Sequence, residues 1–186
     1  MHMHMQPGER GYHVFYYLAA GAPGDLRTEL QLSSVESYHY LAAERAVAAK
    51  GQDKTDATMF EATQAAMTAV GFGPNEIKWV WALLASVLTL GEVSFAEAAE
   101  GDATSVSEAS ARHLSRVGQM LKFDAKAMGK ALTTRRIKAG GEWIESPVRP
   151  EDAVRLRDGF AKAIYARAFA WMVRTINSHL FTGEQP

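Results

Sequence analysis

The chain has 186 residues, of which 47% are hydrophobic and 22% charged, and its formal net charge is −1. This balance is typical of a globular protein with a buried core, and it excludes a disordered chain and a generally basic nucleic-acid-binding protein. The absence of cysteine excludes disulfides and cysteine-ligated zinc, and every apolar run is too short to span a membrane.

The N-terminal half predicts helices separated by glycine and proline. Its first five residues, MHMHM, resemble a cloning remnant, and we expect residues 6–186 to form a single domain. Apolar and aromatic spacing predicts helices over residues 7–20, 25–32, 53–70 and 75–90. Asp53 or Thr55 is a candidate N-cap of the third helix, and the apolar residues of the fourth predict burial on two sides.

The C-terminal half predicts further helices and little strand. Residues 92–95 alternate like a short strand, and Ala96–Thr104 has the acidic, alanine-rich composition of a surface loop. One helix is expected from Ser105 or Ser107 to Leu121, and another is expected from an Asp124 cap to Leu132. A final long helix follows Pro150, with a predicted inner stripe of Leu156, Phe160, Ile164, Met172, Ile176 and Leu180.

The segment between the last two helices departs from the helical pattern. It reads LTTRRIKAGGEWIESPV, residues 132–148, and places β-forming residues on both sides of Gly140–Gly141. This pattern predicts a small β-hairpin. Residues 132–174 carry nine Lys or Arg against five Asp or Glu, so an acidic partner is expected to meet this part of the chain.

Motifs for catalysis, metal binding or cofactor binding are absent from the sequence. It contains neither a G-x-x-x-x-G-K-[ST] phosphate loop nor a G-x-G-x-x-G turn, and no two histidines in the body of the chain share metal-ligand spacing. His13 beside aromatic residues indicates a packed helix surface, and His113 between arginines indicates a solvated face. The residues alone therefore predict a mainly α domain with one basic ribbon.

Six collinear segments resemble the myosin motor head. They are QPGERGYHVFYYLAAGA at 6–22, YHYL at 38–41, FEATQAAMTAVGF at 60–72, LLASVLTLGEVSF at 83–95, ALTTRRI at 131–137 and RDGFAKAIYARAFAWMVRTIN at 157–177. The first is similar to the family's Q-x-G-E-R-N-Y-H-I-F-Y-x-L-L-x-G. Departures from the family's L-H-L-G-N-I and D-A-L-A-K motifs, at residues 88–93 and 158–162, put the myosin class in doubt but not the family.

The resemblance implies a position within a larger motor. The chain would be the upper 50-kilodalton subdomain, a mainly α fold with a small β-hairpin and a long C-terminal helix, between the first and second switches. The parent would be an actin-activated ATPase that uses MgATP and acts on the cytoskeleton in the cytoplasm. Its other head parts would supply the nucleotide site, so the isolated chain is expected to be inactive and to contain no cofactor. A non-catalytic helical interaction module with a myosin-like fold remains the alternative.

The resemblance also implies a role for the hairpin, because the corresponding loop of myosins docks on actin. The residues expected to contact the acidic surface of actin are Arg135, Arg136, Lys138, Glu142, Trp143 and Ile144. Alternatively, Trp143 packs on the domain and the ribbon only connects two helices. Glu142 stands sixteen residues before Asp158, a position where many myosins carry an acid or a phosphorylated Ser or Thr. The acidic loop Ala96–Thr104 corresponds to a second actin-facing loop, but its charge disfavours contact.

Overall fold

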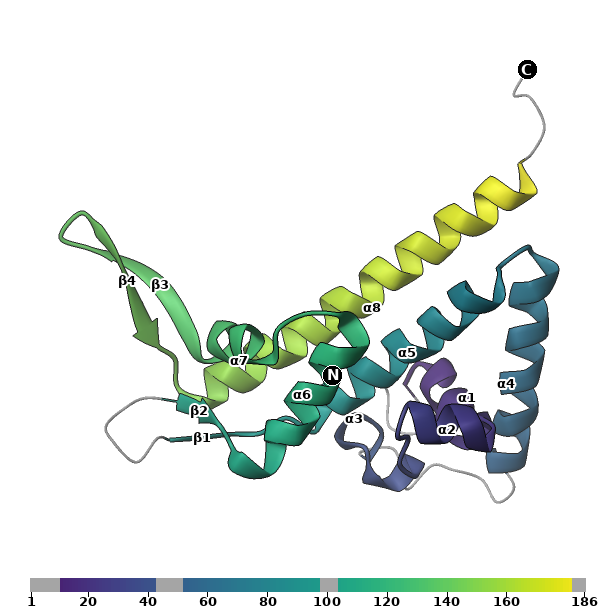
Figure 1. The fold of residues 1–186 in the computed structure, drawn as a ribbon, viewed down its shortest axis with the longest axis horizontal. Coiled ribbons are helices and arrows are strands. Elements are labelled where there is room, and N and C mark those ends of the chain that lie inside the picture. The colour runs from purple at the N-terminus through teal and green to yellow at the C-terminus, as the bar shows by residue number, and fades with distance from the viewer. Residues whose placement is uncertain (1–10, 43–51, 98–103, 182–186) are drawn as a thin grey trace. The chain divides into compact units, whose positions relative to one another are not determined.

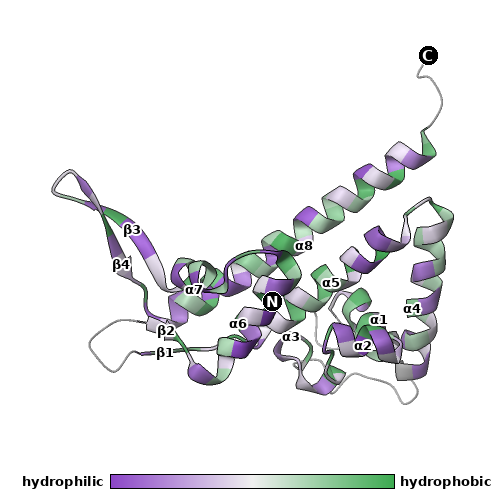
Figure 2. Cartoon of the chain, in the orientation of Figure 1, coloured by the Kyte–Doolittle hydropathy of each residue, from purple (hydrophilic) through white to green (hydrophobic). Residues whose placement is uncertain are grey.

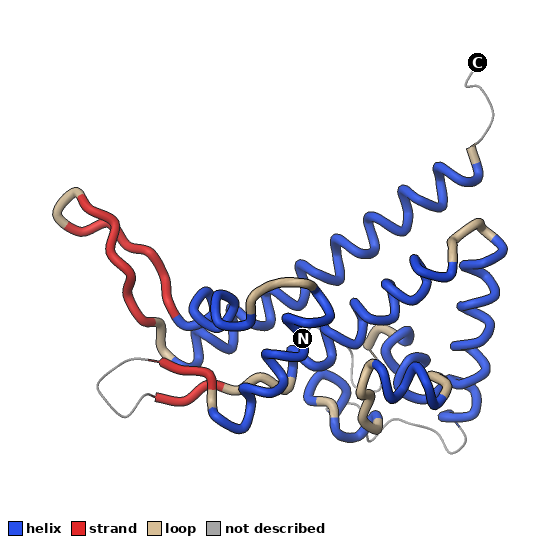
Figure 3. The backbone as a smooth tube through the Cα atoms, in the orientation of Figure 1, coloured by secondary structure: helices blue, strands red, loops and turns tan. Residues whose placement is uncertain are grey.

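The computed structural model describes residues 11–42, 52–97 and 104–181. Helices predominate in these ranges, and the strands form two antiparallel pairs (Figure 1, Figure 3). The last helix of the described residues is the long α8, which spans Pro150–Leu180. The mainly α fold with a hairpin and a long C-terminal helix, predicted from the sequence, is therefore confirmed.

The chain divides into two units, with residues 1–88 and 163–186 in unit 1 and residues 89–162 in unit 2. The elements of unit 1 are α1 (His13–Gly21), α2 (Gly24–Glu29), the 3-10 turn η1 (Val35–Ser37), α3 (His39–Ala42), α4 (Gln52–Ala69), most of α5 (Pro74–Gly91) and the C-terminal part of α8. The elements of unit 2 are β1 (Phe95–Glu97), β2 (Thr104–Val106), the 3-10 turn η3 (Glu108–Ser110), α6 (Ala111–Leu121), α7 (Ala125–Thr133), β3 (Thr134–Ala139), β4 (Glu142–Pro147) and the start of α8.

Aromatic residues form the core of unit 1. Phe15 and Leu18 of α1 are buried, and the ring of Phe60 on α4 lies 4.5 Å from that of Trp81 on α5. The ring of Tyr165 on α8 stacks on Tyr12 at 4.3 Å, which joins the C-terminal part of the long helix to the start of α1. Every residue from Leu83 to Leu90 is buried, and this confirms the predicted burial of α5.

Several element boundaries differ from the sequence-based expectations. The predicted helix start at Pro7 lies outside the described residues, and α1 begins at His13 because Tyr12 has a non-helical ψ of 112°. Asp53 and Thr55 both lie within α4, so neither is its N-cap. The cap predicted at Asp124 is confirmed, since its carboxylate accepts a 2.7 Å hydrogen bond from the backbone N–H of Ala127.

The strand before the acidic segment also begins later than predicted. β1 starts at Phe95 rather than Glu92 and pairs antiparallel with β2. The expected loop therefore loses Ala96, Glu97 and Thr104 to strands, and its residues 98–103 lie outside the described chain. Ser105 is a strand residue, and α6 begins only at Ala111, after a 3-10 turn with Ser107 at its N-cap.

The buried stripe of α8 differs from the predicted one. Leu156 and Leu180 are 43% and 62% exposed, and the other four predicted residues are only half-buried. The buried positions are instead Ala153, Arg157, Ala161 and Ala168. Hydrophobic and hydrophilic residues alternate along the whole helix in Figure 2, so hydropathy alone does not identify its inner side.

Candidate functional site

The hairpin β3–β4 has the predicted turn. Gly140 and Gly141 both have positive φ, 58° and 92°, which is the backbone that a two-residue type I′ turn requires. The turn sets the register, in which Ala139 faces Glu142 and Lys138 faces Trp143. Glycine suits both positions because L side chains rarely adopt positive φ and would be strained there.

The base of the hairpin is tied to the rest of unit 2. The backbone N–H of Val148 donates to the carbonyl of Thr133 at 3.0 Å, and the hydroxyl of Thr104 donates to the carbonyl of Val148. Lys130 of α7 forms a 2.7 Å ion pair with Glu145 of β4. Figure 1 shows the glycine turn extending away from α7 and from the β1–β2 pair. The hairpin is therefore held at its base and exposed at its tip.

The register gives the hairpin two chemically different faces, because successive side chains of a strand point to opposite sides. The basic-aromatic face consists of Thr134, Arg136, Lys138, Trp143, Glu145 and Pro147. The aliphatic face consists of Arg135, Ile137, Ala139, Glu142, Ile144 and Ser146. The six residues predicted to bind actin thus share one hairpin but are divided equally between its faces.

The predicted site residues are accessible. Trp143 is 61% exposed and Ile144 is 45% exposed, so Trp143 does not pack into the domain. The Arg136 guanidinium lies 5.3 Å from the centroid of the Trp143 ring, which is within cation–π range. Among the described residues, no carboxylate lies within ion-pair distance of Arg135, Arg136 or Lys138.

Sequence reasoning missed the role of Lys130 and the division into faces. Lys130 neutralises Glu145, but the contact joins two elements fifteen positions apart, and no local pattern predicts it. The faces, by contrast, follow from the glycine turn. A two-residue turn fixes which residues face one another, so the alternation could have been read from the sequence.

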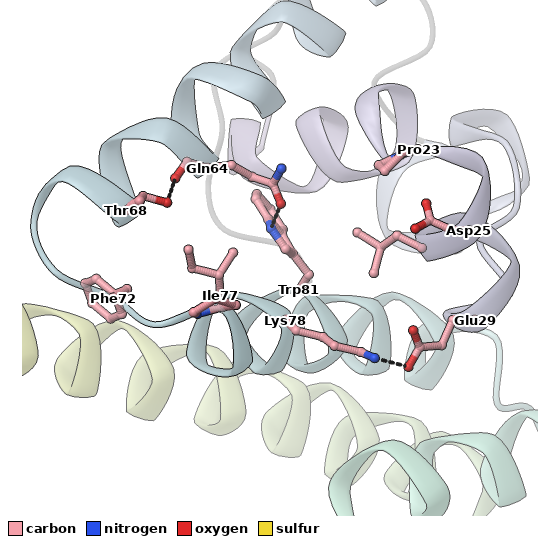
Figure 4. A pocket seen from close by; sticks show the side chains of 11 residues that line it. Pro23, Asp25, Glu29, Gln64, Thr68, Phe72, Ile77, Lys78 and Trp81 are labelled. Atoms are coloured by element: carbon pink, nitrogen blue, oxygen red, sulfur yellow. Dashed lines mark hydrogen bonds and ion pairs between the residues drawn. The ribbon is translucent and has the colours of Figure 1, made fainter.

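Unit 1 contains a concave site, with a volume of about 380 Å³ (Figure 4). Residues of α2, α4 and α5 line it, together with the turn between α4 and α5. The indole N–H of Trp81 donates to the Gln64 side-chain carbonyl at 3.2 Å, and Lys78 pairs with Glu29 at 2.8 Å. These contacts stabilise the walls, and no nucleophile–base pair lies among the lining residues.

The described residues were also compared with the requirements of a metal site, a titrating histidine and a membrane-spanning helix. Within residues 11–42, 52–97 and 104–181, no group of three or more His, Asp or Glu side chains is arranged to hold a metal ion. Burial lowers the pKa of His113, with a further contribution from Arg112, and the neutral imidazole is therefore favoured at neutral pH. No helix in the described ranges is long and apolar enough to cross a membrane.

Comparison with known proteins agrees with the resemblance seen in the segments. The model of the family described as myosin head (motor domain) matches residues 2–186. Unconventional myosin-Ic of Danio rerio is 36% identical over 177 residues, which cover 95% of this chain and 17% of that protein. Unconventional myosin-XV of Homo sapiens is 37% identical over 171 residues, which cover 91% of this chain and 5% of that protein. The chain thus spans at most about a sixth of these relatives, and it belongs to the myosin head family.

Proposed function

We propose that this chain is part of an actin-based motor, between the first and second switches of the head, where it supplies a filament-contacting hairpin and a scaffold. The complete motor would couple MgATP hydrolysis to movement on actin filaments, and the remaining parts of the head would hold the nucleotide. The site of action would be the actin cytoskeleton in the cytoplasm. Membership of the myosin head family supports the proposal that the complete protein is a motor. The exposed hairpin supports the proposal that this chain contacts the filament.

The observation that carries the proposal is the exposed hairpin itself. Arg135, Arg136 and Lys138 have no carboxylate partner among the described residues, so their charges act on whatever approaches. A positive protrusion raises the association rate with an acidic filament and favours correct orientation. Trp143 adds a large aromatic surface, and residues of this kind contribute strongly to binding when an interface covers them.

Direct sedimentation with filaments tests the proposal. We expect the 186-residue chain to pellet with filamentous actin in a saturable manner, and the affinity to fall as salt rises because charge steering is screened. The chain centrifuged without filaments provides the background. No filament-dependent pelleting, even at low salt, would contradict the proposed contact and favour a helical interaction module.

Glu142 gives a second test, in the complete motor. Its carboxylate lies at the exposed turn and has no ion-pair partner among the described residues. We expect Glu142→Ala to lower actin-activated ATP turnover while basal turnover and melting temperature stay nearly unchanged, because an exposed charge contributes little to folding. Glu142→Asp keeps the charge and is expected to retain activation. Equal activation of Glu142→Ala and the parent would remove Glu142 from the proposed site.

A further inference from the structure

We propose that the concave site of unit 1 binds a small organic cation with an aromatic or branched apolar body, which rests on the apolar lining while the positive charge lies beside Asp25. This site, the unit 1 cavity, is formed by residues of α2, α4, α5 and the turn between α4 and α5. All of them belong to residues 1–88, whereas the hairpin belongs to unit 2. Such binding would therefore be independent of filament contact.

The size and lining of the unit 1 cavity suit a small molecule. Its volume of about 380 Å³ lies within the range of about 300–1,000 Å³ that small-molecule sites occupy. Such sites are lined mainly by apolar and aromatic side chains, with a few polar groups that fix the orientation of the ligand. The apolar residues of this lining are Pro23, Leu26, Phe72, Pro74, Ile77 and Trp81. An apolar ligand body would therefore find a complementary surface.

The aromatic part of the lining is ordered without a ligand. Trp81 is buried, and it is held by the ring of Phe60 at 4.5 Å and by the 3.2 Å hydrogen bond from its indole N–H to Gln64. Phe72 is also buried, and its ring meets that of Trp171 edge-on at 5.7 Å. Because these side chains are already fixed, a ligand would lose little free energy in ordering them.

The charges of the lining favour a cation. Three charged residues line the unit 1 cavity, and two of them, Lys78 and Glu29, neutralise each other at 2.8 Å. The carboxylate of Asp25 has no ion-pair partner among the described residues. Figure 4 shows Asp25 on α2, across the cavity from Phe72 and Ile77. One lysine against two acids gives the lining a net charge of −1, which attracts a cation and repels an anion.

Three compounds of similar shape but different charge test the proposal. Benzamidine is a cation at neutral pH, benzamide is neutral, and benzoate is an anion. The indole N–H of Trp81 reports on the cavity in a nitrogen–proton correlation NMR spectrum of the 186-residue chain, which has four tryptophans. Trp79→Phe, Trp143→Phe and Trp171→Phe each remove one of the other indole signals, so the signal that remains in all three variants belongs to Trp81.

We expect benzamidine to shift the Trp81 signal with a dissociation constant on the order of millimolar, which is typical of so small a ligand. Benzamide should bind about fivefold more weakly because it lacks the charge that Asp25 attracts, and benzoate should bind more weakly still. In Asp25→Asn, benzamidine and benzamide should bind within about twofold of each other. Glu61→Gln makes the same change of charge on α4 outside the cavity, and it should retain the preference for benzamidine.

Three results would overturn the proposal. If benzamidine leaves the Trp81 signal unchanged, the unit 1 cavity does not bind this class of ligand. If the three compounds shift the signal alike, the cavity does not select a cation. If Glu61→Gln loses the preference as Asp25→Asn does, the net charge of the chain selects the cation and Asp25 does not. A Trp81 signal at the same position in ligand-free Asp25→Asn and in the parent shows that the substitution leaves the cavity intact. The sedimentation experiment with filaments is unaffected by any of these results.

Discussion

Replacing Arg157 with leucine is expected to lower the free energy of unfolding by about 2–3 kcal/mol, because two buried carbonyls would lose a charged hydrogen-bond donor. Arg157 is only 4% exposed. Its guanidinium donates to the carbonyls of Gly91 at 3.1 Å and Val93 at 2.7 Å, where α5 ends, and it pairs with Asp158 at 2.7 Å. Leucine would remove these donors and leave the two carbonyls in a buried site without them.

Urea unfolding followed by circular dichroism measures this effect, and Arg155 provides the control. Arg155 is an exposed arginine on the same helix, and its pair with Asp152 at 2.7 Å lies in solvent. Arg155→Leu is expected to change the free energy of unfolding by less than about 0.5 kcal/mol. Similar destabilisation by the two substitutions would show that the contacts of Arg157 with Gly91 and Val93 add nothing to the free energy of unfolding.

Replacing Gly21 with alanine is expected to lower the free energy of unfolding of unit 1 by about 1–3 kcal/mol, the usual cost of overpacking a core. A methyl group at Gly21 would lie 2.4 Å from the Cβ of Phe60 and 3.0 Å from the Cα of Ala57. Phe60 is 1% exposed and its ring lies 4.5 Å from that of Trp81, so it has no open space into which to move. Relief would require α1 and α4 to separate.

Gly24→Ala is the matched control, measured by the same urea unfolding. Gly24 begins α2, and nothing lies within 4 Å of the position that its methyl group would occupy. Alanine there should leave stability unchanged or raise it by up to about 1 kcal/mol, because it restricts the unfolded chain. If Gly21→Ala proved as well tolerated as Gly24→Ala, the close approach of α1 to α4 would not limit the residue at position 21.

The features that the sequence predicted correctly depend on residues close to one another in the chain. The helix α5 is recognisable because its apolar residues recur at helical spacing, and it begins at Pro74, one residue before the predicted start. The Asp124 cap and the Gly140–Gly141 turn each need only a few adjacent residues. The docking role of the hairpin came mainly from the family resemblance, and it stays a prediction.

Where the prediction failed, contacts between distant segments decided the outcome. The inner stripe of α8 was assigned by residue size and hydropathy, yet its buried positions include Arg157 and three alanines. Burial on α8 depends on how closely the backbone of neighbouring elements approaches the helix, and on which buried carbonyls need a hydrogen-bond donor. A guanidinium bonded to the end of α5, 64 to 66 residues away, satisfies that need. No window of neighbouring residues contains this information.

The sequence by itself thus determined the helices, the hairpin turn with its register, and the basic character of the ribbon, since local geometry and residue chemistry suffice for these. Only the tertiary structure decided that Lys130 neutralises Glu145, that Trp143 is exposed, and that Gly21 must lack a side chain. Each of these depends on atoms brought together by packing. The number of residues between two such positions in the chain does not indicate how close they lie in the folded structure.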